Sequence, residues 1–121
     1  MTNSSKNKEF DLEERTAKFG EDVIEFCKSV PVGPIHKILI SQTVRSATSV
    51  GANYCEANGA SSRKDFKNKI HICQKEAKET KHWLRMFAKA IPDQSETIRS
   101  LWKECHELTL IFGKILSSLK N

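Results

Sequence analysis

The feature that most constrains the fold is the spacing of apolar residues, which recur every three or four positions in four successive segments. The clearest runs lie in residues 62–91 and 93–119, where steps of three and four alternate in a heptad. This spacing places the apolar side chains on one face of an α-helix. Proline or glycine separates the segments. The sequence therefore predicts four amphipathic helices and contains no pattern typical of a β-strand.

Polar residues at the segment starts have the spacing of helix caps. Asp11 stands three residues before Glu14, and Asp93 stands three residues before Glu96, which is the spacing of a capping box. Pro34 suits the first turn of the second helix, because the fixed backbone angle of proline is helical. We therefore expect helices at about residues 11–30, 34–57, 62–91 and 93–119.

The short connections between these helices favour antiparallel neighbours. We predict an all-α, antiparallel up-down-up-down four-helix bundle over residues 10–121. In the second helix, Ile35, Ile38 and Leu39 are expected to anchor the chain in the core. Residues 1–9 are polar, and we expect them to form a disordered tail.

Length and composition indicate one small globular domain. The chain has 121 residues, and none of its apolar runs approaches the roughly 18 residues needed to cross a bilayer. The N-terminus lacks the apolar core of a signal peptide. We therefore expect a cytoplasmic protein without a membrane partner, whose four cysteines stay reduced.

Charge is distributed unevenly along the chain, whose net charge is +5. Residues 9–32 carry seven acidic and three basic side chains, whereas residues 63–92 carry nine basic and three acidic ones. In the third helix, basic residues recur every three or four positions opposite the apolar face. This set is the basic stripe: Lys64, Lys67, His71, Lys75, Lys78, His82, Arg85 and Lys89.

The basic stripe has three possible roles. It could track the phosphates of RNA or DNA, in which case binding weakens as salt rises. It could be a solvated helix face, which is common for lysine-rich helices. It could also pair with the acidic first helix, within one subunit or between subunits. The sequence has no RNA-recognition motif, zinc finger or helix-turn-helix signature, so nucleic-acid binding would depend on the backbone and be weakly sequence-specific.

Residues 45–57 of the second helix are mostly small and suit close helix packing. A polar stripe runs through this segment at spacings of four, four and three: Arg45, Ser49, Asn53 and Glu56. Buried charges need partners. We therefore expect Glu56 and the third-helix residues Glu76 and Glu79 to pair with this stripe in the bundle, with Trp83 packed nearby.

The fourth helix has more apolar surface than one bundle core requires. Leu110, Ile111 and Leu116 lie outside or at the edge of its apolar face. Exposed apolar patches usually mark an interface. We therefore expect the chain to associate with copies of itself through these residues, although a wide and partly exposed core face is the alternative.

Metal binding and catalysis find little support in the residue spacing. Cys73 and Cys105 fall on apolar faces, where reduced cysteine packs as a small apolar residue. No Cys-x-x-Cys or His-x-x-x-His pair occurs, and Glu-x-x-His occurs once, at Glu79 and His82, whereas a bundle di-metal site needs that pair on two helices. We expect no cofactor, no metal and no enzymatic activity. Trp83 and Trp102 are expected to pack against the bundle, with base stacking as the alternative role.

Two motifs carry a family resemblance. Arg45-Ser-Ala-x-Ser-Val-x-Ala-Asn-Tyr-x-Glu-Ala in the second helix and Lys75-Glu-Ala-x-Glu-Thr-x-x-Trp-Leu84 in the third resemble the bacterial 23S rRNA intervening-sequence family. That resemblance implies a four-helix bundle that assembles as a homopentamer with a central channel. It also implies structural roles, at the bundle centre or subunit contacts, for the matching polar positions: Arg45, Asn53, Glu56, Glu76, Glu79 and Trp83.

The resemblance extends to a related branch, the accessory protein of diversity-generating retroelements. That protein is a basic pentameric bundle that binds nucleic acid and a reverse transcriptase. The name of the intervening-sequence family records where its genes were first seen and does not by itself imply binding to ribosomal RNA. Residues and resemblance together favour an RNA-binding bundle, with an oligomeric scaffold for protein partners as the alternative.

Overall fold

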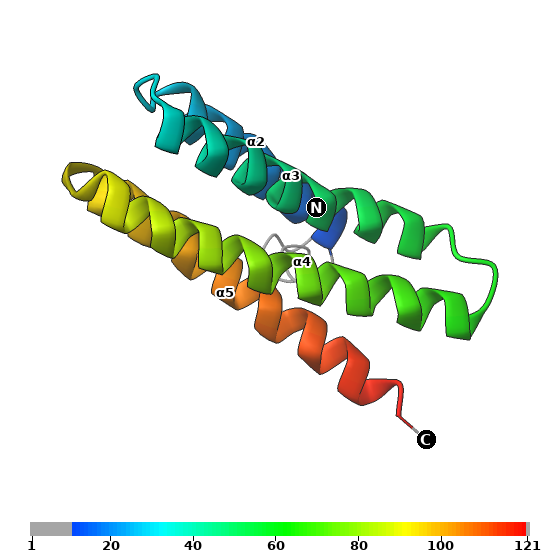
Figure 1. Cartoon of the computed structure of the whole chain (residues 1–121). Coiled ribbons are helices and arrows are strands. Elements are labelled where there is room, and N and C mark those ends of the chain that lie inside the picture. The colour runs from blue at the N-terminus through cyan, green and yellow to red at the C-terminus, as the bar shows by residue number, and fades with distance from the viewer. Residues whose placement is uncertain (1–10, 121) are drawn as a thin grey trace, which may run out of the picture.

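The computed structural model describes residues 11–120, and the predicted N-terminal tail lies outside this range. These residues form four α-helices and one 3₁₀ turn: α2 (Leu12–Lys28), α3 (Pro34–Asn58), α4 (Arg63–Ala90), η1 (Pro92–Gln94) and α5 (Ser95–Ser118). Figure 1 shows that successive helices run in opposite directions. None of residues 11–120 forms a β-strand. The predicted all-α four-helix bundle is confirmed.

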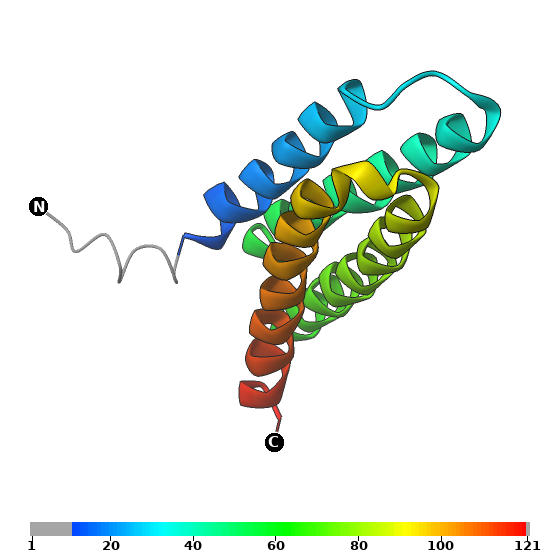
Figure 2. The ribbon, with the colours of Figure 1, turned by 90° about the vertical axis from the view of Figure 1, so that its left-hand side faces the viewer.

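The four helices surround a common core with one loose seam. α3 packs along α2 on one side and along α4 on the other, and α4 packs along α5. α2 is shorter than the other helices and meets α5 over a small area only. Figure 2 shows α5 continuing past the start of α2. Within residues 11–120, the C-terminal turns of α5 therefore have no helix beside them on the α2 side.

Capping residues explain three of the four helix starts. The Asp11 side chain accepts a hydrogen bond from the Glu14 backbone at 3.3 Å, as predicted. Ser62 accepts one from the Asp65 backbone at 3.0 Å and so begins α4. Pro34 is the first residue of α3.

The predicted cap at Asp93 is wrong. Residues 92–94 form the 3₁₀ turn η1, closed by a hydrogen bond from the Gln94 backbone to the Ile91 carbonyl at 3.0 Å. α5 begins after this turn at Ser95, with no side-chain cap. The physical reason lies in Pro92, which starts the tight turn and places Asp93 inside it.

The core consists of the apolar faces that the heptad spacing predicts. Phe26 of α2 and Phe87 of α4 meet edge to face, with ring centroids 5.1 Å apart. The largest fully buried side chains come from all four helices and include Phe19, Val23, Val50, Ile70, Leu84, Phe87, Leu108 and Phe112. The expectation for the start of α3 is only partly right. Leu39 is buried, but Ile35 and Ile38 are 65% and 62% exposed, because they lie on a flank of α3 that no other helix of the described residues covers.

Small residues bring α2 and α3 close together. A methyl group added at Gly51 would lie 3.4 Å from the backbone and side chain of Thr16, and one added at Gly20 would lie 3.6 Å from Thr48. Ala47 is fully buried between these contacts. This is the close packing that residues 45–57 predict. No helix within residues 11–120 is long and apolar enough to span a membrane.

Candidate nucleic-acid interface

The basic stripe follows α4 along its whole length on the side opposite the core. Seven of its members are exposed, and Lys67 is half-buried. The buried face of α4 carries Ile70, Cys73, Ala77 and Leu84, which hold the helix against its neighbours. Over 28 residues this helix is about 42 Å long. α4 therefore presents a straight, solvent-facing row of cationic side chains.

Members of the basic stripe have no carboxylate partner within the part of the chain that the structure describes. The ion pairs of that part involve other basic residues, such as Arg15, Arg45 and Lys69. α2 and α4 lie at diagonal corners of the bundle and meet through core side chains such as Phe26 and Phe87, whereas the basic stripe lies on the opposite side of α4. Pairing of the basic stripe with acidic α2 inside one subunit, which the sequence left open, is therefore wrong. The positive charge of the stripe faces solvent.

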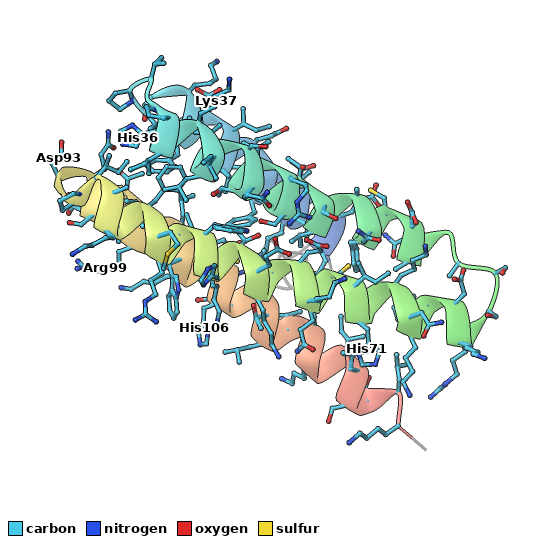
Figure 3. The ribbon with its side chains drawn as sticks, viewed as in Figure 1. His36, Lys37, His71, Asp93, Arg99 and His106 are labelled. Carbon is cyan, nitrogen blue, oxygen red and sulfur yellow. The ribbon has the colours of Figure 1, made fainter. Side chains whose placement is uncertain are left out.

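Helix α5 adds basic side chains that the sequence did not place on this surface. Figure 3 shows Arg99 and His106 of α5 along the same edge of the α4–α5 pair as His71 of the basic stripe. Lys103 is also exposed on α5. In the sequence, Arg99, Trp102 and His106 recur at steps of three and four, which places them on one face of α5. The sequence alone does not show which face of α4 lies beside them. The basic surface thus extends over two helices.

One contact between α4 and α5 organises aromatic and basic groups together. Lys81 Nζ lies 2.9 Å from His106 Nδ1 and 4.9 Å from the centre of the Trp102 ring. The Trp102 and His106 rings are stacked, with centroids 5.0 Å apart and planes 12° apart. A lysine ammonium can only donate, so His106 Nδ1 accepts this hydrogen bond. This interaction fixes the side chains on which the Trp102 ring rests.

Arg45 lies in a charged cluster between α3 and α4. Its guanidinium group contacts Glu76 at 3.3 Å and also Glu79. The Trp83 indole donates a hydrogen bond to Glu79 at 3.0 Å. Glu76 is buried, whereas the Arg45 side chain is 49% exposed. The structure thus brings these four residues together at the edge of the bundle.

The remaining members of the polar stripe on α3 form separate local pairs. Asn53 donates to the side chain of Ser49 at 3.0 Å. Glu56 is exposed and pairs with Lys69 of α4 at 2.8 Å, which raises the pKa of the lysine. The expectation that Glu56 pairs with the Arg45 stripe inside the bundle is therefore wrong. The reason is geometric, since Glu56 lies three turns from Arg45, near the start of α4.

The expected interface residues of α5 lie in different environments. Leu110 is 60% exposed and Ile111 is half-buried. Both line a groove with a volume of about 510 Å³ that also includes Leu12, Tyr54 and Ile115. Leu116 is buried in the core of its own chain, so the expectation that it is free to form an interface is wrong. It faces inward because it lies four residues, about one helical turn, after the buried Phe112.

Three of the four cysteines, Cys27, Cys73 and Cys105, are buried. Burial raises the pKa of the Cys27 thiol to about 11 and the pKa values of Cys73 and Cys105 to about 12. Those three thiols are therefore neutral at physiological pH, and Cys55 is the exposed one. Within residues 11–120, no group of three or more His, Cys, Asp or Glu side chains could hold a metal ion.

The acidic surface is separate from the basic one. Glu13, Glu14, Glu21 and Glu25 are exposed on α2. Arg15 reaches across the loose seam to α5, where it meets Glu104 at 2.7 Å and Glu107 at 2.7 Å. These hydrogen bonds, led by the one to Glu104, raise the pKa of the Arg15 guanidinium further above its ordinary value. One side of the molecule is therefore acidic, and the α4–α5 side is basic.

Comparisons with known proteins agree with this fold. A protein from Bacteroides thetaiotaomicron, described as a protein of unknown function from the S23 ribosomal protein family, has a similar crystal structure with a TM-score of 0.76 and 29% sequence identity. The similarity covers 87% of this chain and 97% of that one. No curated protein sequence matches significantly. The family model of the 23S rRNA-intervening sequence protein matches residues 8–114. The chain belongs to the 23S rRNA-intervening sequence protein family.

Proposed function

We propose that this chain is a non-catalytic bundle that binds RNA through the phosphate backbone, with the basic stripe of α4 as its contact surface. The observation that carries the proposal is the unbroken row of solvent-facing basic side chains, none of which pairs with a carboxylate in the described part of the chain. Cationic groups at such spacing replace counterions along a phosphate backbone. The basic side chains of α5 widen the same surface.

A salt series with a labelled structured RNA and a labelled DNA duplex tests this proposal. Binding should weaken as salt rises, because each lysine–phosphate contact releases a counterion. A triple variant, Lys67→Gln, Lys75→Gln and Lys78→Gln, should bind more weakly. The slope of log affinity against log salt should fall by about 2 to 3 in magnitude for three lost contacts.

The matched control removes the same charge from another surface. Lys18→Gln, Lys28→Gln and Lys37→Gln also lower the net charge by three, and these exposed lysines lie on α2 and α3. The control should keep a slope close to that of the wild type. If both triple variants lose the same affinity, net charge alone explains the loss and the basic stripe is not the contact surface. Absence of binding at low salt would also reject the proposal.

A second candidate function rests on the groove beside Leu110. We propose that copies of this chain associate through this groove, as a homopentamer if the family resemblance extends to assembly. Leu110 is 60% exposed and shares the groove with the apolar residues Leu12, Ile111 and Ile115 beside a polar rim of Glu107, Lys114 and Ser118, and such patches favour association. In this role the bundle would be an oligomeric scaffold for protein partners. Salt separates the two roles, because docking through an apolar patch does not weaken steeply as salt rises.

A further inference from the structure

A cavity between α4 and α5 has the lining of a nucleotide site. Its volume is about 470 Å³, and it lies at the end of the helix pair near η1. Arg85, Arg99 and Lys103 supply three positive charges, and Trp102 supplies an aromatic face. The remaining lining residues, Leu84, Ala88, Ser95 and Ile98, are apolar or small and include no carboxylate. This combination of a flat ring with several cations differs from the uniformly cationic surface of the basic stripe.

Trp102 is held in place with one of its faces directed at the cavity. His106 stacks on the ring from the following turn of α5, whereas the cavity residues Arg99 and Ser95 belong to the preceding turns. Trp102 therefore lines the cavity on the side of these preceding turns of α5. Trp102 is 36% exposed, so a flat ligand can reach it. Because Lys81 and His106 already orient the indole, stacking requires little reordering of the side chain.

Trp83, the other tryptophan, lacks these properties. Its indole is half-buried and donates its N–H to Glu79, on the side of α4 that faces α3. A carboxylate beside the ring repels a phosphate. Both side chains are indoles, but the surroundings of Trp102 favour a ligand that carries a phosphate and those of Trp83 do not.

We propose that the cavity beside Trp102 binds one unpaired nucleotide of a single-stranded nucleic acid, with the base stacked on Trp102 and the adjacent phosphates on Arg85, Arg99 and Lys103. Every base has an aromatic face, so this recognition is tolerant of sequence. Arg85 belongs both to the basic stripe and to the cavity lining, so a strand that follows the stripe reaches the cavity without leaving the protein surface. This inference rests on the proposed function and adds to it a preference for unpaired segments.

Tryptophan fluorescence tests the stacking contact directly, because the chain has two tryptophans. The variant Trp83→Phe retains Trp102 as its one indole, and Trp102→Phe retains Trp83. The probes are an eight-nucleotide poly-A RNA, a blunt RNA duplex and inorganic polyphosphate. The single strand should quench the emission of Trp102 and leave that of Trp83 nearly unchanged. If polyphosphate quenches Trp102 equally, the cavity recognises anions without bases and the proposal is overturned.

Affinity measurements provide a second readout. Trp102→Leu keeps an apolar side chain against Ile98 and Leu84 but removes the ring. It should lower affinity for the single strand by about 5- to 150-fold, the range found when a stacking aromatic is removed, and leave duplex affinity within about twofold. Arg99→Gln should also weaken single-strand binding. Because this variant keeps the indole, it tests the same cavity if Trp102→Leu does not fold. Trp83→Phe is the matched control and should bind both probes as the wild type does.

The outcomes separate the two proposals. Salt-dependent duplex binding combined with unchanged single-strand binding by Trp102→Leu and Arg99→Gln overturns the stacking site and leaves the basic stripe as the binding surface. Single-strand binding that depends on Trp102 but survives the triple lysine change supports the stacking site and rejects the stripe. Absence of all nucleic-acid binding rejects both.

Discussion

Arg45 shows how much a single side chain reveals before the structure is known. The rule that charges within a bundle need partners predicted its neighbours, and the structure places Arg45 against Glu76 and Glu79. The rule could not predict how deeply the cluster lies. Depth depends on how far each helix is rotated toward the core, and this rotation leaves Arg45 half exposed while Glu76 is buried.

Replacement of Arg45 by alanine should lower the free energy of unfolding by about 1 to 3 kcal/mol. That range lies between an exposed ion pair, which contributes up to about 1 kcal/mol, and the loss of one partner from a buried pair. The cost arises because buried Glu76 loses its cation. Urea unfolding monitored by circular dichroism measures the change.

Glu56→Gln is the control for Arg45→Ala, because Glu56 and Lys69 form an exposed pair between the same two helices. It should change stability by less than about 1 kcal/mol. If the two variants unfold at the same urea concentration, the cluster around Arg45 has no special structural role.

Helix α2 shows what heptad spacing can and cannot predict for an element. The spacing predicted its existence and its buried face, whereas the cap at Asp11 was predicted from the separate spacing of Asp11 and Glu14. It could not predict that α2 packs closely on α3 yet barely meets α5, because that depends on the offset between helices distant in sequence. Arg15 is the main polar connection across this seam, since it binds both Glu104 and Glu107.

Arg15→Gln should loosen α2 more than any other element. The variant removes a two-pronged contact that is largely shielded from water, and we expect a loss of about 1 to 2 kcal/mol. Hydrogen exchange measured by mass spectrometry should show faster exchange in residues 12–28, with α4 nearly unchanged. Lys18→Gln is the control, because Lys18 pairs only with Asp22 of its own helix in the described chain. Equal exchange of α2 in both variants would show that apolar packing alone holds the seam closed.

The whole molecule combines features that no single helix reveals. The order of helices, their antiparallel directions and the core could be predicted from the sequence, because neighbouring segments with short connections pack together. The combined surface of α4 and α5 could not, because Arg99 and Trp102 become part of it only when the two helices are placed side by side. The groove at Leu110 likewise requires knowledge of where α2 begins.

Light scattering after gel filtration tests association of whole molecules. The monomer mass is 13.7 kDa, and a homopentamer has five times that mass. Leu110→Lys should shift the protein to the monomer, because a buried interface does not accept an unpaired charge. Ile38→Lys changes an equally exposed apolar residue on α3 and should leave the assembly intact. If Ile38→Lys dissociates the assembly and Leu110→Lys does not, the interface lies on the flank of α3 that carries Ile38. A monomeric wild type would reject self-association.

The separation of charge between α2 and the α4–α5 side has a consequence for the speed of encounter. A molecule with acidic groups on one side and basic groups on the other experiences a torque near a polyanion and turns its positive side forward before contact. Orientation of this kind raises the association rate constant and leaves the dissociation rate constant largely unaffected. In the proposed function, exposed glutamates such as Glu21 and Glu25, which lie on α2 away from the basic stripe, would thus influence how quickly a nucleic-acid strand is found.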